Sequence, residues 1–84
     1  MLSINEAKKI IEKNIPKCKP QLCILYKNLY VFVVFTDDEL EEKMDPFYSV
    51  DSDTGEFEDF AFLDHISEIT SLLKNPLKVF NKND

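Results

Sequence analysis

The sequence predicts an α+β fold in which a helix at each end of the chain flanks three or four antiparallel strands (α-β-β-β-β-α). A run of seven apolar residues, Leu29 to Phe35, contains six β-branched or aromatic side chains and is typical of a buried central strand. Apolar residues also recur at helical spacing in the first 15 residues and again after residue 64. Turn residues separate the strand-like segments between these two regions.

The N-terminal helix has recognisable limits. Ser3-Ile4-Asn5-Glu6 matches a capping box, in which the Ser3 hydroxyl accepts from the Glu6 N–H and the Glu6 side chain reaches back. Pro16 ends the helix because it has no N–H and forces the preceding residue towards extended geometry. The apolar face between these limits comprises Ile4, Ala7, Ile11 and Ile15.

A hairpin is predicted to follow this helix. Its strands are Pro20–Tyr26 and Leu29–Phe35, and Lys27-Asn28 is a two-residue turn because Asn tolerates positive φ. The second strand is apolar on both faces, so one face is expected to contact the helices. The other face is expected to contact a second copy of the chain or a partner.

A second hairpin is predicted in the C-terminal half. Pro46–Asp51 has a strand pattern, and Ser52–Gly55 is a turn with the only glycine of the chain at the position that requires positive φ. Glu56–Phe60 is predicted as a short return strand. Its charges suit an edge strand, where they oppose pairing with other chains.

The last predicted element is a helix that begins near Asp64, its candidate cap, and ends at Asn75-Pro76. The residues beyond it are expected to pack back onto the core, and residues 81–84 are expected to fray. The apolar face of the helix comprises Ile66, Ile69, Leu72 and Leu73, and the returning residues are Leu77, Val79 and Phe80.

The length of 84 residues indicates a single domain, with an ordered core at about residues 3–75. The longest apolar run is much shorter than the ~20 residues of a membrane-spanning helix, so no membrane partner is expected. The N-terminus lacks the apolar segment of a signal peptide, which favours a cytoplasmic protein. Cys18 and Cys23 are therefore expected to be free thiols.

The sequence predicts neither an enzyme nor a cofactor. His65, the only histidine, is interpreted as a surface or capping residue, because the sequence places no Ser or Cys nucleophile beside it. Two cysteines with one histidine form a poor set of metal ligands. Asp53-Thr54-Gly55 matches the triplet of aspartic proteases, but its polar neighbours Ser52 and Glu56 indicate a turn.

Charge is distributed unevenly along the chain. Residues 37–68 hold thirteen acidic side chains and one lysine, whereas the first 36 residues hold six lysines and two glutamates. Because the chain has no arginine and its middle is acidic, direct binding of nucleic acid is not expected. A protein with a basic surface is the complementary partner. The residues predicted to contact it are Asp37, Asp38, Glu39, Glu41, Glu42, Asp45, Phe47, Tyr48, Glu56, Glu58 and Asp59.

The segment Val50-Asp51-Ser52-Asp53-Thr54-Gly55-Glu56-Phe57 resembles the closing hairpin of PepSY-like domains and of the immunity protein 35 family. The order of elements before this hairpin also resembles that of these families: an early helix with Glu6-Ala7, a strand, and the aromatic-rich strand at Tyr30–Phe35. Residues 45–51 are also similar to small uncharacterised proteins of phages and prophages. The resemblance covers roughly residues 3–75. It implies a non-catalytic α+β module that works by binding, as an inhibitor, a regulator or a neutraliser of a toxin.

Together these observations predict a small acidic binding protein of bacterial or phage origin that inhibits, neutralises or regulates a protein partner. One alternative is a structural or assembly protein, either in a phage particle or as a homodimer through the Leu29–Phe35 strand. Another alternative is a mimic of nucleic acid that blocks a host defence nuclease, because spaced carboxylates imitate phosphates.

Overall fold

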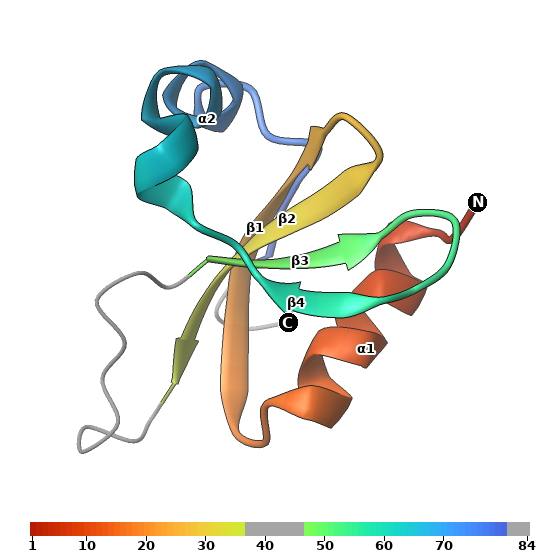
Figure 1. The fold of residues 1–84 in the computed structure, drawn as a ribbon. Coiled ribbons are helices and arrows are strands. Elements are labelled where there is room, and N and C mark those ends of the chain that lie inside the picture. Colours follow the sequence, from red (N-terminus) through yellow and green to blue (C-terminus); the bar gives the residue numbers. More distant parts are fainter. Residues whose placement is uncertain (37–46, 81–84) are drawn as a thin grey trace.

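The computed structural model describes residues 1–36 and 47–80 and shows the predicted α+β fold (Figure 1). Helices α1 (Ile4–Asn14) and α2 (Ile66–Leu73) lie on opposite sides of a five-stranded antiparallel sheet, and a short 3-10 helix, η2 (Phe62–His65), precedes α2. The strand order is β4-β3-β2-β1-β5. The strands are β1 (Cys18–Tyr26), β2 (Leu29–Thr36), β3 (Phe47–Asp51), β4 (Phe57–Asp59) and β5 (Lys78–Val79).

The sheet has one strand more than the sequence predicts. Strand β5 pairs with β1, where the Leu77 N–H donates to the Cys23 carbonyl (2.9 Å) and the Phe80 N–H to the Gln21 carbonyl (2.8 Å). The expected return of the C-terminal residues to the core is confirmed at Phe80, which is buried, but Leu77 and Val79 are exposed. A two-residue strand is too short to produce a recognisable alternation in sequence.

The capping box at the start of α1 is confirmed. The Ser3 Oγ accepts from the Glu6 N–H (3.1 Å), and the Ser3 N–H donates to the Glu6 Oε1 (2.9 Å). These hydrogen bonds with Ser3 hold the pKa of the Glu6 carboxyl below its usual value. The helix ends at Asn14, two residues before Pro16, and buries Ala7 and Ile11 against the sheet.

The two-residue turn between β1 and β2 is also confirmed, because Tyr26 and Leu29 face each other across it. Lys27, rather than Asn28, takes the positive φ, at 55°. Strand β2 pairs with β1 on one side and with β3 on the other, which makes it the central strand.

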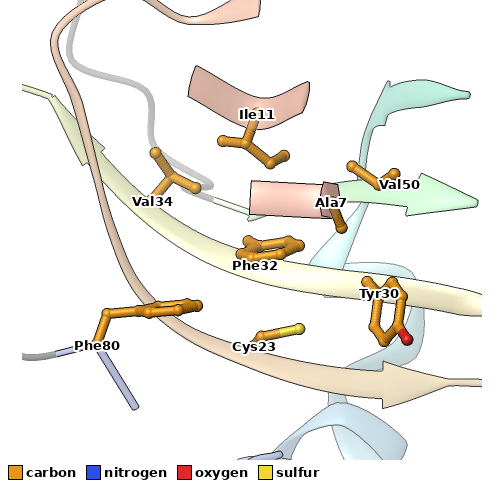
Figure 2. Packing of buried hydrophobic residues seen from close by; sticks show 8 residues of the cluster. All are labelled: Ala7, Ile11, Cys23, Tyr30, Phe32, Val34, Val50 and Phe80. Carbon is orange, nitrogen blue, oxygen red and sulfur yellow. The ribbon is translucent and has the colours of Figure 1, made fainter. Parts of the chain in front are cut away.

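Both faces of β2 are covered within the chain as far as Val34, whereas Phe35 is exposed. Helix α1 covers one face, where Ala7 and Ile11 pack over Phe32 and the Phe80 ring stacks on it (Figure 2). The second face packs against η2 and α2 instead of remaining open as the sequence suggested. Its buried cluster comprises Ile24, Tyr26, Val31, Phe47, Phe60 and Ile69.

Two details of the predicted C-terminal helix are wrong. Asp64 lies inside η2, and neither η2 nor α2 has a side-chain hydrogen bond at its N-terminus. Ile66, assigned to the buried face, is 48% exposed, whereas Ile69 is fully buried. Ile66 is the first residue of α2 and directly follows η2, whereas the rest of the predicted apolar face, Leu72 and Leu73 included, packs against the sheet.

The helices of residues 1–36 and 47–80 are all too short or too polar to span a membrane.

Replacing Gly55 with alanine is expected to lower the free energy of unfolding by about 1–2 kcal/mol. Gly55 has a φ of 78°, and an added Cβ would lie 3.3 Å from the Cδ1 atoms of Ile10 and Leu2. Urea denaturation of Gly55→Ala measures the effect. The control is Asp53→Ala, an exposed position of the same turn, which should change stability by less than about 0.5 kcal/mol. Equal stability of Gly55→Ala and the parent would contradict the prediction.

Candidate functional site

The acidic hairpin, residues 47–59, is the candidate partner-binding site of the described structure. It comprises β3, the turn and β4, and β4 forms one edge of the sheet (Figure 1). No lysine occurs between residues 47 and 68. The acidic residues of the hairpin are Asp51, Asp53, Glu56, Glu58 and Asp59.

Asp51 organises the turn of this hairpin. Its Oδ1 accepts from the N–H groups of Thr54 (3.0 Å) and Asp53 (2.8 Å), and the Thr54 hydroxyl accepts from the Glu56 N–H (3.2 Å). These backbone hydrogen bonds, that of Thr54 first, hold the pKa of Asp51 below its usual value. The interpretation of Asp53-Thr54-Gly55 as a turn is therefore confirmed. Sequence reasoning did not identify Asp51 as the residue that shapes it.

The structure separates the two aromatic residues predicted at this site. Phe47 is 8% exposed and stacks on Phe62 at 4.6 Å between ring centroids, so it is a core residue on the α2 side of the sheet. Tyr48 is half-buried, packs with the cluster on the α1 side and stacks on Phe57 at 5.6 Å. Only Tyr48 contributes to the outer surface of the hairpin.

The charged residues of the predicted site fall into two groups. Glu56, Glu58 and Asp59 are exposed on or beside β4, and Asp59 lies opposite Tyr48 in the strand register. The acidic residues between β2 and β3 lie outside the described residues; they are Asp37, Asp38, Glu39, Glu41, Glu42 and Asp45.

Two lysines lie near the edge of the sheet opposite the acidic hairpin. Strand β5 forms the opposite edge of the sheet, and Lys78 lies on it. The Nζ atoms of Lys8 and Lys78 lie 5.0 and 5.8 Å from the centroid of the Phe80 ring beside that edge. The fold therefore places an acidic edge at β4 and lysines at the edge formed by β5.

A polar cluster that sequence reasoning missed joins β1 to α2. The Tyr26 hydroxyl donates to the Glu68 Oε2 (2.5 Å) and lies 3.3 Å from the His65 Nδ1. The hydrogen bond with Glu68, more than burial, raises the pKa of Tyr26. His65 occupies the N-cap position of α2, but its ring contacts Tyr26 and Phe60 and makes no capping hydrogen bond. No local pattern signals contacts between residues so far apart in sequence.

The cysteines are free thiols, as predicted. Cys18 is half-buried and Cys23 is buried, and desolvation raises the pKa of Cys23 to about 12. Burial also raises the pKa of Cys18. Within residues 1–36 and 47–80, no three His, Cys, Asp or Glu side chains are grouped to hold a metal ion.

Comparisons of the chain with protein-family models, with curated proteins and with solved structures find no match. The resemblance to PepSY-like domains and to the immunity protein 35 family stays a prediction.

Proposed function

We propose that the chain is a small, cytoplasmic, non-catalytic protein that neutralises or regulates a protein partner with a basic surface. The observation that carries this proposal is the exposed acidic edge of the sheet at β4, in a part of the chain without lysine. The resemblance of the hairpin sequence to immunity proteins and inhibitors supports a binding protein of bacterial or phage origin.

The acidic hairpin suits electrostatic recognition. Like charges on adjacent residues create a negative potential that accelerates encounter with a basic protein and disfavours acidic ones. Glu56, Glu58 and Asp59 supply exposed charge, and the half-buried Tyr48–Phe57 pair supplies apolar area beside it. Aromatic side chains surrounded by polar groups are frequent anchors of protein interfaces.

The described structure does not favour assembly through β2. Strand β1 pairs along the length of β2, strand β3 pairs with its residues Leu29–Val33, and the two helices cover its faces as far as Val34. A homodimer through residues Leu29–Val33 of β2 would require one of these elements to move, whereas Phe35 at the end of the strand is exposed.

The test begins with capture of the partner from a bacterial lysate at low salt, its release at high salt and its identification by mass spectrometry. The dissociation constant is then measured for the purified pair. Glu56→Lys/Glu58→Lys is expected to weaken binding about tenfold at low ionic strength, with a smaller loss at high salt. A partner that also binds DNA, and from which DNA displaces this chain, would identify the interaction as nucleic-acid mimicry.

The matched control is Glu12→Lys/Asp64→Lys, which changes the net charge equally at exposed positions outside the hairpin. This variant should change the dissociation constant less than twofold, or about 0.4 kcal/mol. Equal losses in the two variants would show that only total charge matters. Unchanged binding in the hairpin variant would exclude the β4 edge as the site.

A further inference from the structure

We propose that α2, together with His65, is a cover that opens and closes over the second face of the sheet independently of the rest of the fold. This α2 cover is His65 and residues Ile66–Leu73. A hydrogen-bonded latch, formed by Tyr26 with Glu68 and His65, holds it closed. The proposal does not depend on the identity of the partner.

The latch is the main polar contact between the cover and the sheet. A tyrosine hydroxyl has one proton, and the Tyr26 hydroxyl donates it to the Glu68 carboxylate. The 3.3 Å contact with His65 is therefore a hydrogen bond in which the His65 Nδ1–H donates to the Tyr26 oxygen. The Tyr26 hydroxyl thus binds two side chains of the cover at once, at a part-buried position.

The remaining attachment of the cover is weak in comparison with that of α1. Ile69 is its only fully buried residue, Leu72 and Leu73 are half-buried, and its N-terminus lacks a side-chain capping hydrogen bond. A helix of eight residues is not stable by itself in water. Local opening is expected where few apolar side chains hold a segment to the core.

Contacts on either side allow the cover to open without unfolding the sheet. On the N-terminal side of the cover, the ring of Phe62 stacks on Phe47 of β3. On the C-terminal side of the cover, the N–H groups of Leu77 and Phe80 donate hydrogen bonds to backbone carbonyls of β1. The cover is therefore tethered at both ends and held in its middle by Ile69 and the latch. Its opening exposes the apolar side chains of Ile24 and Val31 on the sheet.

Native-state hydrogen exchange of the full chain, followed by NMR, tests the proposal. In the parent protein, amides in the last turn of α2 should exchange faster than those of β2. Tyr26→Phe keeps the ring but removes the latch, and should accelerate exchange in α2 about tenfold or more, while the β2 amides remain better protected than those of α2. Glu68→Gln, at an exposed position that retains an acceptor, should give a smaller acceleration in the same amides.

Tyr30→Phe is the matched control. Its hydroxyl donates to the Leu2 carbonyl (2.7 Å) near α1, so its removal should accelerate exchange around the start of α1 and leave α2 unchanged. Two results would overturn the proposal. One is exchange of the α2 amides at the rate of the β2 amides in the parent; the other is acceleration of the α2 amides in Tyr30→Phe, because it would show that they exchange only when the whole fold unfolds.

Discussion

Replacing Phe32 with alanine is expected to lower the free energy of unfolding by about 3–5 kcal/mol. Phe32 lies in the central strand, is fully buried, and packs beneath Ala7 and Ile11 of α1 while stacking on Phe80 at 6.1 Å between ring centroids (Figure 2). Removal of the ring leaves a cavity among elements from both ends of the chain, which cannot close without moving α1 or β5. Urea denaturation followed by circular dichroism measures the loss.

Phe35→Ala is the control for this prediction, because it makes the same chemical change in the same strand. Phe35 is 53% exposed, so its truncation removes little buried area and should cost less than about 1 kcal/mol. Similar losses at the two positions would contradict the burial that the structure assigns to them.

Replacing Ile69 with alanine is expected to destabilise the closed position of α2 by about 2–5 kcal/mol. Ile69 is the fully buried residue of this helix, and its neighbours on the sheet include Ile24 and Val31. Hydrogen exchange of the α2 amides measures the effect, because these amides report how often the helix leaves the sheet. If α2 opens separately, the loss in urea denaturation of the whole protein cannot exceed the free energy of opening α2, because beyond that value the open form becomes the folded state.

The control for Ile69 is Ile66→Ala, one helical turn earlier. Ile66 is 48% exposed, and its replacement should change exchange in α2 less than threefold, or about 0.7 kcal/mol. A larger effect at Ile66 than at Ile69 would contradict the exposure of Ile66 and the burial of Ile69 in the structure.

Local features were predictable because their causes lie within a few residues. The capping box of Ser3 and Glu6 satisfies backbone groups of its own first turn, and Pro16 acts on its immediate neighbours. The Lys27-Asn28 turn and the positive φ of Gly55 follow from the same kind of local constraint. The apolar run at residues 29–35 indicates a central strand, whichever strands pair with it.

The candidate site was predictable only in part. The acidic composition of the hairpin is a property of the sequence, and the exposure of Glu56, Glu58 and Asp59 follows from the edge position of β4. The sequence does not say which face of β3 a residue occupies in the finished sheet. Phe47 and Tyr48 are adjacent and both aromatic, yet the pleat places them on opposite sides, one in the core and one near the surface.

The sequence alone therefore determined the order of the helices and main strands, two of the turns and the acidic character of one segment. Only the tertiary structure decided that α2 covers the second face of β2, that β5 completes the sheet, and that Tyr26 meets Glu68. The physical reason is that these contacts join residues far apart in sequence, so they depend on the strand order and register of the whole sheet. No local propensity specifies that arrangement.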